Sequence, residues 1–376
     1  MKIIAKRALL PEGWMQSCAV EVEGGRIVSI QSGSKGDLYA DILTPGLLDK
    51  HQHGALGFDA AHPTWDACER WLRMLAQHGV TALLYTIGTG PVEVTRQALA
   101  FARQAMDAQR HGKLRGARIL GAHLEGPFIN PARKGAMAQA FIQPPSISTF
   151  EALTGENANI VRAVTLAPEM PRAEALTAYL IARGICVQVG HSDANVAQAR
   201  TSFDLGATGV THMFNAMSPI SARVPGLPVE ALLDERVYCE VVCDLIHVDA
   251  RMLALLLRLK GPHRTVMISD SVATAGLPDG HYDAGNHPVV VRERRNYSES
   301  GSISGGYEQL DFGVRNVIRL GVPEAEAFAM ASATPAAYLG LSGELGWIAS
   351  GARACLTAWN DSHQPVWALC DGVMIE

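Results

Sequence analysis

Apolar runs and amphipathic stretches alternate through the middle of the chain. Continuous apolar runs of this length are typical of strands buried on both faces, and the stretches between them repeat apolar residues at helical spacing. The expected strands are Leu47–His53, Val80–Thr86, Arg118–Glu125, Val161–Ala167, Ile185–His191, Gly209–His212, Glu240–His247 and Thr265–Asp270. The clearest helices are Asp66–His78, Val92–Arg110, Ala194–Phe203, Asp311–Leu320 and Pro323–Ala333. Eight strands alternating with helices predict a TIM-type (β/α)8 barrel, in which chemistry lies at the carboxyl ends of the strands.

Both ends of the chain have a different pattern of short strands and turns. Near the start, Cys18–Val22 and Arg26–Ile30 flank a Gly-Gly turn, and near the end Ala354–Trp359 and Val366–Leu369 have the same character. We therefore expect a small β-sandwich domain built from residues 1–44 and 344–376. The barrel is expected to span residues 45–343.

Composition narrows the class of protein. The 376 residues are 48% apolar and carry a net charge of −5, so a nucleic-acid partner is not expected. The first residues contain no apolar segment of the kind found in secretory signals, and Met252–Leu259 is too short to span a bilayer. Seven scattered cysteines are typical of reduced thiols. These features predict a cytoplasmic protein without a membrane partner.

Residues of the kind that bind metals stand at the ends of most expected strands. Residues i and i+2 of a strand share a face, so His51 and His53 can point into one site. Imidazole and carboxylate groups are the ligands of zinc, iron(II), cobalt and manganese. One histidine at a strand end means little among thirteen, whereas a repeated placement predicts a metal centre. The residues are His51, His53, His123, Glu125, His191, His212, His247 and Asp270.

The expected metal centre suggests hydrolysis. A bound metal lowers the pKa of water toward neutrality and so supplies a nucleophile, while a nearby carboxylate moves the proton to the leaving group. Asp270 lies in a polar Ser-Asp-Ser setting and suits that role. It could instead cap the segment that follows.

Several motifs resemble those of the N-acetylglucosamine-6-phosphate deacetylase family of the amidohydrolase superfamily. The run Pro45–Gly54 resembles the first metal motif of the superfamily, and the His-Leu-Glu-Gly-Pro context of Glu125 is similar to that of the deacetylases. The fourth expected strand ends without the lysine that many other amidohydrolases place there. Further matching segments, in the same order along the chain, are Val189–Ser192, Thr211–Met217, Arg223–Gly226, Asp244–Val248 and Ser269–Asp270.

The resemblance implies a role for each matching position. It implies Glu125, His191 and His212 as ligands of a first metal ion. It implies His51 and His53 as ligands of a second ion, with Glu125 bridging the two. Asp270 is implied as the catalytic acid and base. For the sugar phosphate, the resemblance implies contacts from Asn215 and Ala216. It also implies that Arg223 and His247 bind the phosphate of the partner subunit's site in a homodimer.

Two departures from the family pattern lie around the expected substrate pocket. Where the family has a histidine that contacts the acyl carbonyl, this chain has Met137, and a thioether cannot donate a hydrogen bond. The Ser-Gly-Ser run of the family is replaced by Ser304–Glu308. His123 could supply the missing donor, although its place beside a ligand favours a supporting role.

Three functions remain open on the sequence alone. The first is a deacetylase of N-acetylglucosamine 6-phosphate or its galactosamine epimer, with one or two transition-metal ions. The second is another amidohydrolase, such as a cyclic-amide hydrolase, an N-acyl amino-acid hydrolase or a deaminase. The third is a non-catalytic protein that binds sugar phosphates. Arg223 and His247 favour the first over the second, and the full ligand set with Asp270 argues against the third.

Overall fold

The computed structural model describes residues 1–284, 287–299 and 301–375. Its centre is an eight-stranded sheet in which every neighbouring pair is parallel and β14 lies against β5, which nearly closes a barrel. Along the sheet the strands are β5 (Leu47–Gln52), β8 (Val80–Ile87), β9 (Arg118–Glu125), β10 (Val161–Leu166), β11 (Cys186–Val189), β12 (Gly209–Val210), β13 (Tyr238–Val242) and β14 (Thr265–Ile268). The expected TIM-type barrel is therefore confirmed, with each expected run matched by one strand.

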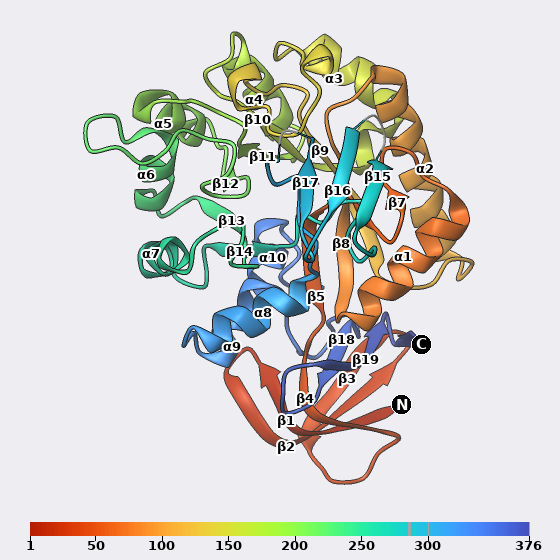
Figure 1. Cartoon of the computed structure of the whole chain (residues 1–376). Coiled ribbons are helices and arrows are strands. Elements are labelled where there is room, and N and C mark those ends of the chain that lie inside the picture. Colours follow the sequence, from red (N-terminus) through yellow and green to blue (C-terminus); the bar gives the residue numbers. More distant parts are fainter. Residues whose placement is uncertain (285–286, 300, 376) are drawn as a thin grey trace.

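Helices surround the barrel, as Figure 1 shows. They are α1 (Trp65–Gln77), α2 (Val92–Arg110), α3 (Ile147–Thr154), α4 (Ala173–Ile181), α5 (Val196–Asp204), α6 (Gly226–Leu233), α7 (Ala250–Lys260), α8 (Leu310–Arg319), α9 (Glu324–Met330) and α10 (Ala333–Tyr338). Helix α2 has the expected bounds and buries Ala98, Leu99, Ala102 and Ala105 on one face. Helix α5 begins two residues later than expected because Asn195 caps it and forms a capping box with Gln198.

A second sheet contains strands from both ends of the chain, seen at the bottom of Figure 1. Its order is β20–β19–β18–β4–β1–β2–β3, with β4 parallel to β1 and antiparallel to β18. The strands are β1 (Lys2–Leu10), β2 (Gly13–Glu23), β3 (Arg26–Ser32), β4 (Leu38–Pro45), β18 (Leu356–Trp359), β19 (Pro365–Cys370) and β20 (Val373–Ile375). These seven strands form the small β domain. Only Gly46 separates β4 from β5, and a Cβ atom there would lie 2.1 Å from Thr81 Oγ1.

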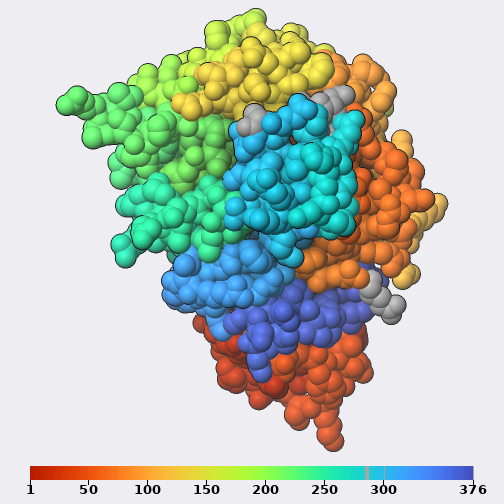
Figure 2. Space-filling view, in the orientation of Figure 1, coloured from red at the N-terminus to blue at the C-terminus, as the bar shows by residue number. Residues whose placement is uncertain are grey.

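Smaller elements stand near the mouth of the barrel. An antiparallel sheet of β15 (Gly280–Ala284), β16 (His287–Val291) and β17 (Asn296–Ser298) follows β14, and a short hairpin of β6 (Gly54–Ala55) and β7 (Phe58–Asp59) follows β5. The short helices η1 (Pro131–Arg133) and η2 (Gln139–Phe141) follow β9, whereas η3 (Gly155–Ile160) directly precedes β10 at the opposite end of the barrel. In Figure 2 the cyan segment that contains β15 to β17 lies between the orange and green parts of the barrel.

Within residues 1–284, 287–299 and 301–375, no helix combines the length and the apolar composition needed to cross a membrane.

Candidate metal centre

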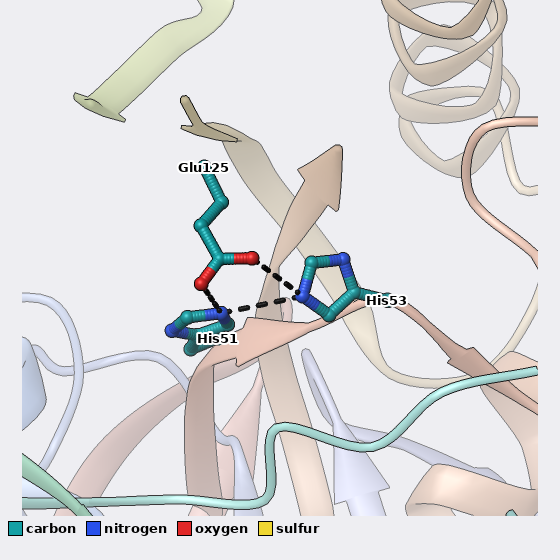
Figure 3. A group of neighbouring side chains, drawn as sticks. All are labelled: His51, His53 and Glu125. Carbon is teal, nitrogen blue, oxygen red and sulfur yellow. Dashed lines mark hydrogen bonds and ion pairs between the residues drawn. The ribbon is translucent and has the colours of Figure 1, made fainter. Parts of the chain in front are cut away.

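Two histidines at the end of β5 face the carboxylate at the end of β9. His51 Nε2 lies 3.3 Å from Glu125 Oε1, and His53 Nε2 lies 3.2 Å from Glu125 Oε2. The two Nε2 atoms are 3.3 Å apart. Figure 3 shows both rings turned toward the same carboxylate. The expected pairing of i and i+2 residues on one strand therefore brings both imidazoles into a single group of possible metal ligands.

A second group of possible ligands shares the same carboxylate. His191 Nε2 and His212 Nε2 each lie 3.1 Å from Glu125 Oε1 and 3.0 Å from each other. All three side chains are buried. Glu125 thus stands between two pairs of imidazoles, one from β5 and one from the segments after β11 and β12.

The hydrogen bonds of His191 indicate that its Nε2 atom carries a lone pair. Its Nδ1 atom lies 2.8 Å from the backbone oxygen of Arg133, and a carbonyl oxygen can only accept, so Nδ1 must donate. In a neutral imidazole the Nε2 atom is then unprotonated, and it points at an oxygen of Glu125. Two acceptors 3.1 Å apart repel each other unless a cation lies between them, so this donor set fits a metal ion.

His51 is held by a buried carboxylate that the sequence analysis did not single out. Glu240, on β13, places Oε2 3.1 Å from His51 Nδ1, and its other oxygen accepts from Lys50, which also donates to Gln188. Burial would raise the pKa of Glu240, but the charges of Lys50 and His51 outweigh it and lower the pKa. The carboxylate therefore accepts from Nδ1 and leaves the Nε2 lone pair for a metal. A glutamate inside a buried strand was the signal that could have revealed this role.

The charges at the centre favour a bound cation. Burial would raise the pKa of Glu125, but His51, His191 and His212 outweigh it and hold the pKa well below its ordinary value. Burial would lower the pKa of His53, but Asp270 and Glu125 outweigh it and raise the pKa to about 9. The carboxylates that attract protons to these imidazoles also attract a metal, with which protons compete.

Asp270 lies beside the β5 histidines and faces the cavity. Its Oδ1 atom is 3.3 Å from His51 Nε2 and 3.5 Å from His53 Nε2. Burial would raise its pKa, but the charge of His51 and the hydrogen bond from His53 outweigh it and lower the pKa, so Asp270 is a carboxylate. The backbone of Asp270 has φ +50°, and His191 and His212 also have positive φ, which side-chain-bearing residues rarely adopt. Such backbone strain gathers at functional sites.

A cavity of about 350 Å³ opens above these side chains. Among the residues expected to contact substrate, Met137, Asn215, Ala216 and His247 line it. His247 Nδ1 lies 2.7 Å from Asp244 Oδ2. Burial would lower the pKa of His247, but its hydrogen bond with Asp244 outweighs it and raises the pKa. The raised pKa favours the cationic form of this imidazole, and that form suits an anionic substrate.

Arg223 and His123 lie outside the lining of this cavity. Arg223 is exposed on the loop between β12 and α6. His123 is fully buried, with its Nε2 atom 2.8 Å from Thr165 Oγ1 and its ring edge-on to His51. It therefore packs behind a possible ligand, and its side chain does not face a substrate in the cavity.

Known proteins share this architecture along nearly the whole chain. The model of the amidohydrolase family matches residues 42–374, and a model of the N-terminal domain of the formimidoylglutamate deiminase HutF matches residues 1–37. The N-acetylgalactosamine-6-phosphate deacetylase of Escherichia coli O157:H7 is 33% identical over 96% of both chains. The N-acetylglucosamine-6-phosphate deacetylase of Vibrio furnissii is 34% identical over 94% of this chain and 90% of the relative.

A solved structure of a deacetylase has the same fold as this chain. A mutant N-acetyl-D-glucosamine-6-phosphate deacetylase from Mycobacterium smegmatis, in complex with N-acetyl-D-glucosamine-6-phosphate, superposes with a TM-score of 0.92 at 29% identity. The match covers 100% of this chain and 99% of that one.

Proposed function

The chain belongs to the amidohydrolase family and, within it, to the N-acetylglucosamine-6-phosphate deacetylases, and we propose that it hydrolyses the N-acetyl amide of an amino-sugar 6-phosphate. The substrate is N-acetylglucosamine 6-phosphate or its galactosamine epimer, and the products are the amino-sugar 6-phosphate and acetate. The observation that carries the proposal is the position of Glu125 between two pairs of imidazoles, with Asp270 beside them at the cavity.

One or two divalent transition-metal ions complete this site in the proposal. Glu125, His191 and His212 would hold one ion, and His51 and His53 would hold a second with Glu125 shared between them. A metal of this kind supplies Lewis acidity, which polarises the amide carbonyl and lowers the pKa of water. Zinc, iron(II), cobalt and manganese all accept this set of nitrogen and oxygen ligands.

Asp270 moves the proton in the proposed reaction. Its carboxylate accepts a proton from the attacking water as the water oxygen bonds to the carbonyl carbon. When the C–N bond breaks, Asp270 returns that proton to the nitrogen, which leaves as the amine of the sugar. The low pKa of Asp270 keeps it in the form that can accept the first proton.

The sugar phosphate occupies the side of the cavity formed by the segments after β12 and β13. There we assign the side chain of Asn215, the backbone of Ala216 and the ring of His247 to the sugar phosphate. Because His247 lines the cavity of its own chain, we assign it to that cavity and not to the partner's, where it was expected. Arg223 is exposed and lies outside the lining of its own cavity, so we propose that Arg223 of the partner subunit reaches the phosphate in a homodimer. The planar guanidinium group matches phosphate oxygens in two-point contacts.

Two further assignments belong to the same proposal. The small β domain comprises residues 1–44 and 344–376, which contain all seven strands of its sheet apart from Pro45 at the end of β4. All seven cysteines are free thiols, which supports a reducing compartment such as the cytoplasm.

The test is acetate release from both epimers of the N-acetylated sugar 6-phosphate, with metal content measured on the same sample. Unphosphorylated N-acetylglucosamine and a cyclic amide serve as comparison substrates. We expect release from at least one phosphorylated epimer and little from the others. Efficient turnover of the cyclic amide alone would reassign the chain to another amidohydrolase function, and binding of the sugar phosphate without any turnover would make it a non-catalytic relative.

A further inference from the structure

The cavity above the metal centre has a polar side and an apolar side. Asn215 and His247 belong to segments that follow β12 and β13. Ile87 ends β8, Val94 lies in the first turn of α2, and Met137 and Phe141 lie in the segment after β9. These four side chains are apolar and lie on the side of the cavity formed after β8 and β9. Val289 and Ile303, which follow β14, add a second apolar group to the lining.

The order of the strands places these two sides opposite each other. Counted around the barrel from β5, β8 and β9 are the second and third strands, and β12 and β13 are the sixth and seventh. In a ring of eight, each of the first two lies across from one of the second two. Glu125, His53, His191 and His212 line the same cavity as both sides.

Hydroxyl groups on the apolar side are already used by the protein. Thr89 Oγ1 donates to the backbone oxygen of Glu125 at 3.1 Å, and Thr95 Oγ1 donates to that of Pro91 at 3.4 Å. The polar pair nearest to this side, after β5, is also bonded internally, since His62 Nδ1 lies 3.0 Å from Asp59 Oδ2. The donors on this side are therefore taken up within the protein, and the side chains left for contact with a ligand are mainly the apolar ones.

The geometry of a secondary amide links the two sides. The amide is planar and strongly prefers the trans form, so the carbons attached to its nitrogen and to its carbonyl carbon point in opposite directions. With the sugar phosphate on the β12–β13 side and the carbonyl at the metal centre, the acyl chain must extend toward β8 and β9. It then meets Ile87, Val94, Met137 and Phe141.

We propose that this apolar side is an acyl pocket that accepts straight chains longer than acetyl, so that the enzyme also hydrolyses N-propionyl and N-butyryl amino-sugar 6-phosphates. The inference rests on the proposed function and extends its substrate class. The chemistry is unchanged: water adds to the carbonyl carbon, the C–N bond breaks, and propionate or butyrate leaves with the free amine. Each buried methylene adds about 4-fold to the binding of the chain.

The test compares kcat/KM for N-acetyl-, N-propionyl- and N-butyrylglucosamine 6-phosphate, measured on the metal-loaded protein by the appearance of the free amine. The galactosamine series is run in parallel. We expect the N-butyryl substrate to have a kcat/KM at least equal to that of the N-acetyl substrate. A lower kcat/KM for N-butyryl, with good release of acetate, would overturn the acyl pocket and leave the proposed function standing. Absence of amine from all of these substrates would overturn both.

A pair of variants tests the location of the pocket. Val94→Phe should fill the apolar side and lower the butyryl-to-acetyl ratio of kcat/KM at least 10-fold. Val92→Phe makes the same change two residues away on α2, where the side chain is exposed and outside the cavity lining, and should leave the ratio as it is. An equal ratio in the two variants would contradict the placement. The comparison of substrates on the unaltered protein does not depend on whether either variant folds.

Discussion

Glu240 places its Oε2 atom 3.1 Å from Nδ1 of His51, on the side of the ring that faces away from Glu125. A carboxylate in this position fixes which nitrogen carries the proton and makes the other nitrogen a better metal ligand. His191 has a different support, the backbone oxygen of Arg133 at 2.8 Å. The two halves of the centre are therefore held by groups of different charge.

We expect Glu240→Gln to weaken the metal held by His51 and His53 by about 10- to 100-fold. The amide is neutral and can turn its nitrogen toward His51, so the ring loses both its charge partner and its fixed tautomer. Titration of metal into chelator-treated protein, followed by calorimetry, measures the affinity. The two binding steps in the titration, one for each half of the centre, should then differ more in affinity than in the unaltered protein.

Glu230→Gln is the matched control, because Glu230 is also a buried glutamate but pairs with Arg200 far from the centre. An equal loss of affinity in both variants would mean that Glu240 acts through general stability. Unfolding temperatures of the metal-free proteins separate that case from a local effect.

Removal of one ligand from the half of the centre formed by Glu125, His191 and His212 should abolish metal binding there. His191→Asn takes away the imidazole that faces Glu125 Oε1, and three ligands become two, so bound metal should fall by at least one equivalent per chain. Elemental analysis of the purified protein gives the count. His263→Asn changes an exposed histidine and should leave the content unchanged. Normal metal content in His191→Asn would exclude the site from this position.

The barrel could be predicted from sequence because its strands are buried on both faces and are therefore continuous apolar runs. For example, strand β8 (Val80–Ile87) is buried at every position, and it ends one residue after the expected last residue, Thr86. The same logic brought His51, His53, Glu125, His191 and His212 into one group, since the carboxyl ends of parallel strands meet at one mouth. Which residue performs which role stays a prediction.

Contacts between residues far apart in the chain, and the geometry of the loops, could not be predicted from the sequence. Glu240 and Lys50 are 190 positions apart in the sequence, and only the fold of the barrel brings them together. The sheet of β15 to β17 was also missed, because its short strands lack a sustained alternation. Two residues of that region, Val289 and Ile303, line the cavity. The polar and apolar sides of the cavity lie opposite each other because of the order of the strands in the barrel. No local sequence pattern predicts that order.

Asp270→Asn should keep the metal held by Glu125, His191 and His212 but lower kcat by about 10²–10⁴-fold, because an amide cannot carry the proton to the leaving nitrogen. The shape of the side chain is preserved, so KM should change less than kcat. Steady-state kinetics and metal analysis on the same sample test both statements. Asp249→Asn, at the exposed cap of α7, is the control. Turnover near that of the unaltered protein would remove Asp270 from the proton path.

Mixing two variants that lack different groups of the site tests the homodimer. If Arg223 serves the site of the neighbouring subunit, Arg223→Ala should raise KM for the phosphorylated sugar about 10-fold or more. A mixed dimer of Arg223→Ala with Asp270→Asn would contain one site with both groups intact. Refolding the two at equal amounts should then restore about a quarter of the normal activity by random pairing, measured at a substrate concentration well below KM, where the Arg223→Ala homodimers contribute little. No gain on mixing, or a monomer by analytical ultracentrifugation with normal phosphate dependence, would contradict this arrangement.

The last prediction concerns Met137, which lines the cavity where the family has a donor to the acyl carbonyl. Its backbone N–H donates to the oxygen of Lys134 at 3.0 Å, and Gly135 lies against His191, so a new side chain should not disturb the turn that holds it beside the centre.

Met137→His should therefore place an imidazole donor near the developing oxyanion and raise kcat on the N-acetyl substrate about 10-fold or more. Met137→Leu keeps the size of the side chain without a donor and should leave kcat close to that of the unaltered protein. The histidine is also polar, so it should lower the butyryl-to-acetyl ratio of kcat/KM while the leucine preserves it. Equal kcat values for the histidine and leucine variants would mean that another group already polarises the carbonyl. Because His123 is buried against Thr165, that group would then be the metal itself.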